Sequence, residues 1–128
     1  MPSPSECVRV LVVDDESAIA DTLARILRHH GFITRSEYSA NAAALAAQHF
    51  SPDVLITDIV MPGNSGIDLA EWFSRARPDC RIILTSANLR HFDSSYLDFE
   101  PGREIAFIPK PVLIPELLEL LGRRESVA

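Results

Sequence analysis

Short apolar runs that suit β-strands alternate regularly with segments that suit helices, and this alternation restricts the fold more than any other feature. The segments between the runs carry apolar residues at helical spacing, three and four positions apart. The expected strands are 7–15, 32–38, 53–59, 80–87 and 104–110, and the expected helices are 16–31, 39–50, 65–78, 88–99 and 114–124. The chain is therefore predicted to repeat a strand-helix unit five times.

Local signals indicate where the helices begin and end. Gly31 is a stop signal for the first helix, Ser39 is a candidate N-cap for the second, and Pro78 follows the third. One face of the first helix is predicted to be apolar; its residues are Ile19, Leu23, Ile26 and Leu27.

Repeated strand-helix units predict an α/β fold, a doubly wound parallel sheet with helices on both faces. Each right-handed crossover returns the chain to the same end of the sheet, so all strands run in one direction. The first, third and fourth strands are almost continuously apolar and should be interior, whereas the second carries Arg35 and Glu37 and should lie on an edge. The strand order 2-1-3-4-5 satisfies both conditions.

The size of the chain suits one compact domain. With 128 residues and 47% hydrophobic content, we expect a single domain over 1–128, with its core at about 8–122 and loose ends. No apolar run approaches the roughly 20 residues that span a bilayer, and the N-terminus lacks a signal-peptide pattern. These observations predict a cytoplasmic protein that does not contact membranes.

Charge and cysteine content narrow the partners and cofactors further. A net charge of −6 disfavours nucleic-acid binding through phosphate neutralisation. Cys7 and Cys80 form no CxxC motif and have no neighbouring histidine, so we interpret both as reduced structural thiols.

Polar residues lie where the predicted strands end. Asp14 and Asp15 end the first strand, Asp58 ends the third, Ser86 the fourth and Lys110 the fifth. The carboxyl ends of parallel strands share one edge, and ligands bind there between the first and third strands of such a sheet. We therefore expect these five side chains to converge.

Three carboxylates in one crevice require a cation, because two unit charges about 4 Å apart repel by roughly 4 kcal/mol at an effective dielectric constant near 20. Hard oxygen ligands favour Mg²⁺, and Mg²⁺ beside an aspartate, a hydroxyl and an ammonium suits phosphoryl transfer. The backbones of Lys110 and Asp58 should be roughly 10 Å apart. We therefore expect Lys110 to reach a group mounted on Asp58 more readily than the bare carboxylate.

Four stretches together resemble the receiver domain of two-component response regulators, the CheY-like superfamily. They are VLVVDDESAIADTL, LITDIVMPGNSGIDL, IILTSA and FIPKP, and the resemblance covers about residues 8 to 122. It implies a flavodoxin-like (βα)₅ fold in which Asp58 accepts a phosphoryl group from a histidine kinase or histidine phosphotransferase. It also implies that Asp15, Asp58 and the backbone carbonyl of Val60 ligate Mg²⁺, while Asp14 helps through water.

The resemblance also implies a set of switch residues. Ser86 would be the hydroxyl that moves to the phosphoryl group, Lys110 its counter-ion, and Phe107 the aromatic switch position. A cis peptide bond between Lys110 and Pro111 is compatible with the family.

Structural interpretations compete with some of these roles. The strand-end acids could cap the following helices, Ser86 could be a plain loop hydroxyl, and Phe107 could be a core residue. Gly63 and Gly66 suit a turn and a helix start.

The sequence departs from the family pattern around the predicted helix 88–99. The stretch YLDFEPGREIAF replaces a shorter entry into the last strand, and Pro109 removes a backbone donor beside Lys110. We expect an irregular helix here, and slow amide exchange throughout residues 88 to 100 would contradict it. The departure puts the usual output surface in doubt.

The leading hypothesis is a signalling phosphoacceptor that switches protein-protein interactions, is not an enzyme and carries no output domain in this chain. Its partners would be a kinase or phosphotransferase and an unknown downstream protein, and we expect a monomer or weak dimer. One alternative is a receiver-like module that binds a partner without phosphorylation. A phosphatase using an aspartyl phosphate is another, but such enzymes usually carry an acid two residues beyond the nucleophile, where this chain has Val60.

Overall fold

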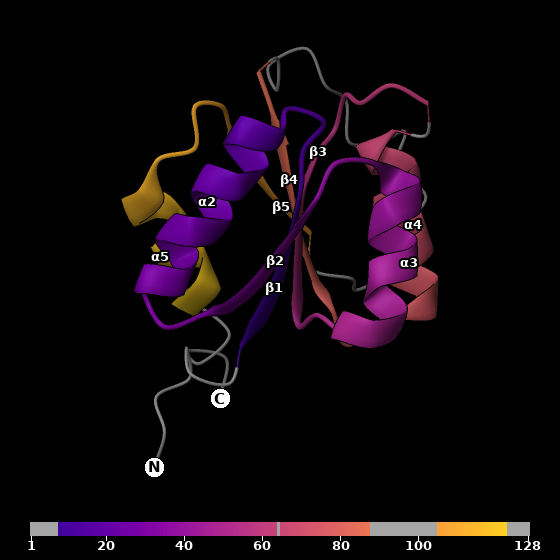
Figure 1. The fold of residues 1–128 in the computed structure, drawn as a ribbon, viewed down its shortest axis with the longest axis horizontal. Helices are drawn as coiled ribbons and strands as arrows, with labels where there is room; N and C mark the ends of the chain where they lie inside the picture. Colours follow the sequence, from indigo (N-terminus) through magenta and orange to yellow (C-terminus); the bar gives the residue numbers. More distant parts are fainter. Residues whose placement is uncertain (1–7, 64, 88–104, 123–128) are drawn as a thin grey trace.

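The computed structural model describes residues 8–63, 65–87 and 105–122 as five strands and four helices (Figure 1). The expected helix over 88–99 lies outside the described residues. The strands are β1 (Arg9–Val13), β2 (Ile33–Glu37), β3 (Val54–Asp58), β4 (Arg81–Ser86) and β5 (Ile105–Pro109). The helices are α2 (Ser17–His29), α3 (Ala40–Phe50), α4 (Gly66–Ala76) and α5 (Ile114–Gly122).

All strand pairs are parallel, and the strand order is β2-β1-β3-β4-β5. The predicted doubly wound fold is confirmed. Every residue of β3 is buried, whereas β2 lies on the edge and contains no fully buried residue, as its charged residues indicated. A strand can be apolar on both faces only where helices cover both sides, so the burial pattern follows from the layering.

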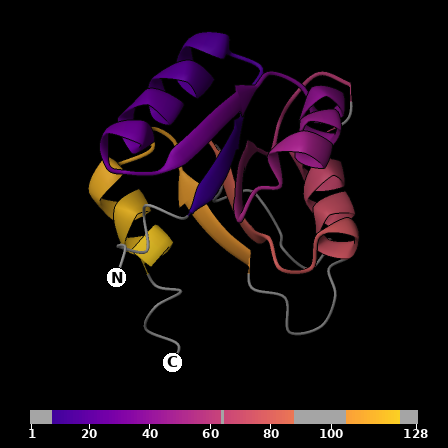
Figure 2. The same cartoon turned by 60° about the horizontal axis from the view of Figure 1, so that its bottom comes forward.

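Helices cover the sheet on both faces, with α2 and α5 on one side and α3 and α4 on the other (Figures 1 and 2). Successive residues of β1 alternate between two core clusters. Leu11 and Val13 pack in the cluster that includes α3 and α4, while Val10 and Val12 pack in the cluster that includes α2 and α5. This is the period of two that a strand imposes on its side chains.

The helix limits follow the local signals. The Ser39 hydroxyl accepts a hydrogen bond from the Ala42 N–H at 3.1 Å and so caps α3, as predicted. Gly31 follows the end of α2 with a φ of +96°, a conformation in which glycine has no steric penalty. The apolar face of α2 is only partly covered, because Leu23 and Leu27 are buried whereas Ile19 is 38% exposed.

At the end of the sheet where the strands begin, arginine side chains donate hydrogen bonds to carbonyls of two helices. The Arg9 Nε donates to the Phe50 carbonyl at the end of α3 at 2.7 Å, and its guanidinium lies 4.4 Å from the centre of the Phe50 ring. Arg77 donates to the Ala47 carbonyl in α3, and Arg81 donates to the carbonyls of Leu120 and Leu121 in α5. Arginine donors at helix C-terminal ends interact favourably with the carbonyls there, so these bonds hold the ends of α3 and α5 against the rest of the fold.

Among the described residues, no helix combines the length and apolar character that membrane crossing requires.

Candidate functional site

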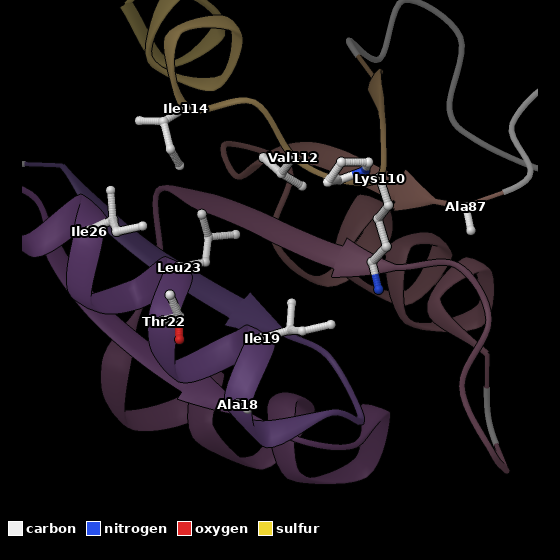
Figure 3. A pocket seen from close by; sticks show the side chains of 10 residues that line it. Ala18, Ile19, Thr22, Leu23, Ile26, Ala87, Lys110, Val112 and Ile114 are labelled. Carbon is white, nitrogen blue, oxygen red and sulfur yellow. The ribbon is translucent and has the colours of Figure 1, made fainter.

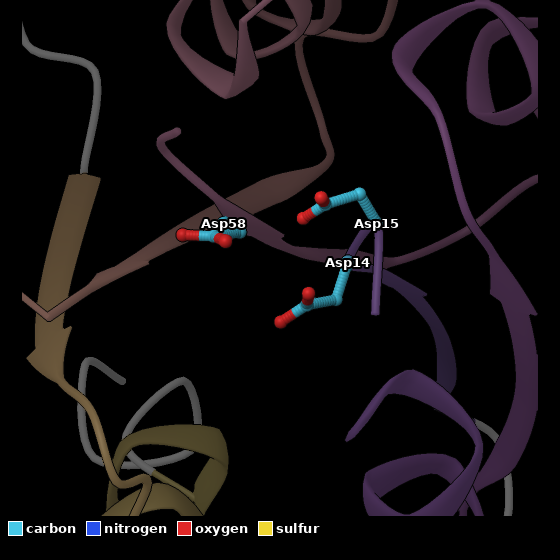
Figure 4. Close-up of side chains that lie close together, drawn as sticks. All are labelled: Asp14, Asp15 and Asp58. Carbon is cyan, nitrogen blue, oxygen red and sulfur yellow. The ribbon is translucent and has the colours of Figure 1, made fainter. Parts of the chain in front are cut away.

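Three carboxylates converge at the carboxyl edge of the sheet. Asp14 and Asp15 directly follow β1, and Asp58 is the last residue of the neighbouring strand β3. One carboxylate oxygen from each lies within 4.8 Å of the others (Figure 4). Asp14 and Asp58 are only 4% and 7% exposed, whereas Asp15 is exposed. The structure thus brings together the three acids that the sequence placed at this edge.

The ammonium group of Lys110 lies between two of these acids. Its Nζ donates to Asp14 Oδ2 at 2.7 Å and to Asp58 Oδ2 at 3.1 Å. The expectation that Lys110 would reach a group on Asp58 more readily than the bare carboxylate is therefore wrong. The four-carbon side chain crosses the distance between the backbones, and attraction from two poorly solvated carboxylates favours that extended conformation.

Lys110 is placed by the strands beside it. It follows β5 directly, and its backbone N–H donates to the Ser86 carbonyl at the end of β4 at 3.0 Å. The peptide bond between Lys110 and Pro111 is cis, as the family resemblance allowed.

The carboxylate of Asp58 and the ammonium of Lys110 shift each other's pKa. Burial raises the pKa of Asp58 above its usual range, and repulsion from Asp14 adds to this rise; hydrogen bonding and charge from Lys110 and the Val60 backbone N–H oppose it. Burial by itself lowers the pKa of Lys110, but its bonds to Asp14 and Asp58 outweigh burial, and the net change is upward. Lys110 is therefore a firmly protonated cation at neutral pH.

Backbone hydrogen bonds also fix the acids. The Asp14 N–H donates to the Glu37 carbonyl at 3.2 Å, which ties the end of β1 to the edge strand. Beyond Asp58, the Ile59 N–H donates to the Thr85 carbonyl at 2.9 Å, and the Ile59 carbonyl accepts from the Gly66 N–H at 2.9 Å. Sequence reasoning assigned Gly66 only to a helix start, because a glycine in a sequence does not reveal which backbone it approaches.

The remaining predicted site residues lie around this cluster. Ser86 is buried at the end of β4, next to the strand that carries Asp58. Val60 lies two residues beyond Asp58 and is 71% exposed. Phe107 is half-buried in β5, opposite Leu84, and packs against the core cluster that includes α3 and α4. Packing of this kind supports the core interpretation of Phe107, and its switch role stays a prediction.

Comparisons with known proteins agree with the geometry. The response regulator receiver domain family matches residues 10–121. The DNA-binding transcriptional regulator NtrC of Rhizobium meliloti (strain 1021) is 34% identical over an alignment of 118 residues that covers 89% of this chain and 23% of that protein. The chain spans between about a quarter and a half of the length of the curated relatives that it matches.

Solved structures show the same architecture. The apo receiver domain of Nitrogen Regulatory Protein C superposes with a TM-score of 0.79 at 30% identity, covering 94% of this chain and 96% of that one. A complex of the histidine kinase ThkA with the response regulator protein TrrA contains a match with a TM-score of 0.74 at 29% identity, covering 91% of this chain and 97% of that one. The chain belongs to the response regulator receiver domain family.

Proposed function

We propose that this chain accepts a phosphoryl group on Asp58 and thereby changes which protein it binds. The observation that carries the proposal is the cluster in which Lys110 bonds both Asp14 and Asp58 while Asp15 lies beside them. A carboxylate nucleophile needs positive charge nearby when it approaches an anionic phosphoryl group. The family of the chain makes this use of such a cluster the expected one.

In the proposed reaction, an ionised oxygen of Asp58 attacks the phosphorus atom of the donor. A phosphorus-oxygen bond forms, and the bond from phosphorus to the donor's imidazole nitrogen breaks, with its electron pair leaving on the imidazole. The product is an acyl phosphate, a mixed anhydride on Asp58. Lys110 would remain beside the new anion as its counter-ion, because its Nζ already lies 3.1 Å from Asp58 Oδ2.

The acidic residues fit a magnesium ion. They offer hard oxygen ligands from more than one direction, and the exposure of Asp15 gives water access to the cluster. Asp15, Asp58 and the Val60 carbonyl would hold the ion, with Asp14 acting through water. When bound, Mg²⁺ supplies positive charge to the phosphoryl oxygens.

Ser86 is the proposed switch hydroxyl, and Phe107 the proposed aromatic partner of the switch. A phosphoryl group on Asp58 adds charge and acceptor oxygens, which should attract the Ser86 hydroxyl and shift the end of β4. Phosphorylation would in this way alter the surface presented to an unidentified downstream protein. We propose that the chain acts as a signalling domain and not as an enzyme that turns over substrate.

An apolar groove next to the acids suits the phosphodonor protein, a histidine kinase or histidine phosphotransferase. The groove has a volume of about 700 Å³ and runs between α2 and the segment that leads into α5 (Figure 3). Ile19, Ile26 and Ile114 line it, and Lys110 belongs both to the groove and to the acid cluster. A helix of the donor seated here would present its phosphohistidine at the edge where Asp58 lies.

The proposal is tested by incubating the chain with acetyl phosphate and Mg²⁺ and reading the intact mass. The expected result is a gain of one phosphoryl group that is absent from Asp58→Asn and absent without Mg²⁺. A chain that gains no phosphoryl group would contradict the proposal and favour the module that binds a partner without phosphorylation. Continuous hydrolysis of many phosphate esters would contradict it in favour of a phosphatase.

A further inference from the structure

Helix α4 begins in direct contact with the backbone of Asp58. A Cβ atom placed on Gly66, the first residue of α4, would lie 1.7 Å from the Asp58 carbonyl oxygen and 2.7 Å from its carbonyl carbon. It would also lie 3.0 Å from the Ile59 Cα. All three atoms belong to the backbone, so no side-chain rotation could relieve the overlap. Only glycine allows this approach.

The same glycine holds one end of the peptide group between Ile59 and Val60. The Gly66 N–H donates to the Ile59 carbonyl at 2.9 Å, while the Val60 N–H of that peptide hydrogen-bonds the Asp58 carboxylate. A trans peptide is planar, and its C=O and N–H point in opposite directions. Fixing the carbonyl therefore also aims the N–H, and Gly66 acts on the acceptor carboxylate through one rigid group.

The start of α4 is itself held firmly. A capping box joins Ser65 and Asp68: the Asp68 N–H donates to the Ser65 hydroxyl at 3.2 Å, and the Ser65 N–H donates to Asp68 Oδ2 at 3.3 Å. Leu69 and Phe73 anchor the helix in the core. The helix start is thus a fixed point against which the peptide beyond Asp58 is set.

We infer that Gly66 is a positioning residue for phosphoryl transfer: through the Ile59 carbonyl and the Val60 N–H it holds the Asp58 carboxylate in its reactive orientation. The inference rests on the proposed function and adds to it a residue that touches neither the donor nor the ion. A carbon at position 66 must displace either α4 or the backbone at Asp58. A misplacement of about 1 Å at a reacting group reduces rates by up to about 100-fold.

The test compares three glycine variants. Gly66→Ala is the probe; Gly122→Ala at the end of α5 is a control with nothing within 4 Å of the added carbon. Gly63→Ala lies three residues before Gly66 and also adds its carbon in open space, but the φ of +76° at Gly63 makes an alanine there strained. Each variant is assayed below its unfolding temperature for the acetyl phosphate rate at saturating Mg²⁺, and the Val60 amide is followed by ¹H–¹⁵N NMR.

We expect Gly66→Ala to lower the rate by about 10- to 100-fold and to shift the Val60 amide. Gly122→Ala should match the wild type, and Gly63→Ala should lose stability while keeping most of its rate. A purely structural glycine would change the unfolding temperature alone. A folded Gly66→Ala protein with a wild-type rate overturns the inference.

A second variant covers the case in which Gly66→Ala does not fold. Ser65→Ala removes the cap and loosens the helix start without adding atoms near Asp58. A several-fold lower rate with a shifted Val60 amide supports the inference, and an unchanged rate despite lower stability overturns it. If the wild type itself gains no phosphoryl group, it is the proposed function that fails.

Discussion

Charged side chains have opposite roles at the two ends of the sheet, the end where the strands begin and the end where they finish. Where the strands begin, arginine side chains bond the carbonyls that end α3 and α5, and Asp53 accepts from the Arg9 backbone N–H at 2.8 Å. Where the strands end, three carboxylates gather, and the Lys110 ammonium bonds two of them, Asp14 and Asp58. Where the strands begin, charged side chains bond backbone groups, whereas like charges gather where the strands end.

The difference separates stability from function. Bonds from charged donors to helix-end carbonyls stabilise the fold, and they need no ligand to do so. Gathered carboxylates lower the stability, as the raised pKa of Asp58 indicates, and they gain favourable interactions when a cation binds. The comparison predicts that substitutions where the strands begin chiefly change the free energy of unfolding. Substitutions where the strands end should chiefly change binding and reactivity.

The largest effect is expected at the edge where the strands begin. Arg81→Ala removes the donor to Leu120 and Leu121 and should lower the free energy of unfolding by about 2 kcal/mol. Arg28→Ala, at an exposed position in α2, is the matched control and should cost far less. Urea denaturation measures both. The comparison fails if Arg81→Ala leaves the free energy of unfolding unchanged but slows phosphorylation of the folded protein.

Lys110→Met tests the other edge. Because the ammonium bonds Asp14 and Asp58 directly, it must yield part of that contact before a metal ion can bind. Its removal should tighten Mg²⁺ binding by about tenfold, equivalent to about 1.4 kcal/mol. Titration calorimetry checks the dissociation constant. Binding that is unchanged or weaker would mean that Lys110 does not compete with the ion.

Asp58→Asn should make the chain more stable at neutral pH. The pKa of Asp58 is raised in the folded chain, so the folded state binds the proton more tightly than the unfolded state does. The stabilisation that protonated Asp58 contributes is therefore fully present at a pH below the usual carboxyl pKa. It is lost as the pH rises through the raised pKa. Urea denaturation should show that the free energy of unfolding of the variant, relative to that of the wild type, increases with rising pH. A difference independent of pH would refute the assignment.

The smallest effect on phosphorylation is expected from Ser86→Ala. The hydroxyl is assigned to the switch and not to the attack, so the acetyl phosphate rate should change little while the NMR response to phosphorylation weakens. Equal spectral responses in wild type and variant would remove Ser86 from the switch.

Most of the fold follows from the sequence because it depends on periodicity. The apolar runs that end in acids indicated β1 and β3, and the charges of β2 indicated its edge position. Convergence of Asp14, Asp15 and Asp58 followed from topology, since parallel strands end at one edge.

Other features depend on contacts that no periodicity encodes. Lys110 reaches the bare carboxylates through the extension of a flexible side chain, and Gly66 approaches the Asp58 backbone where α4 begins. The contacts of Arg81 with α5 link residues about 40 positions apart. Each of these features depends on three-dimensional packing.

The most direct test of the central claim locates the phosphoryl group on the chain. After reaction with acetyl phosphate and Mg²⁺, borohydride reduction converts an aspartyl phosphate to homoserine, and peptide mass spectrometry identifies the position. The account predicts homoserine at position 58 alone. Homoserine at position 14 or 15, or an unmodified Asp58 in a chain that carries the phosphoryl group, would contradict it.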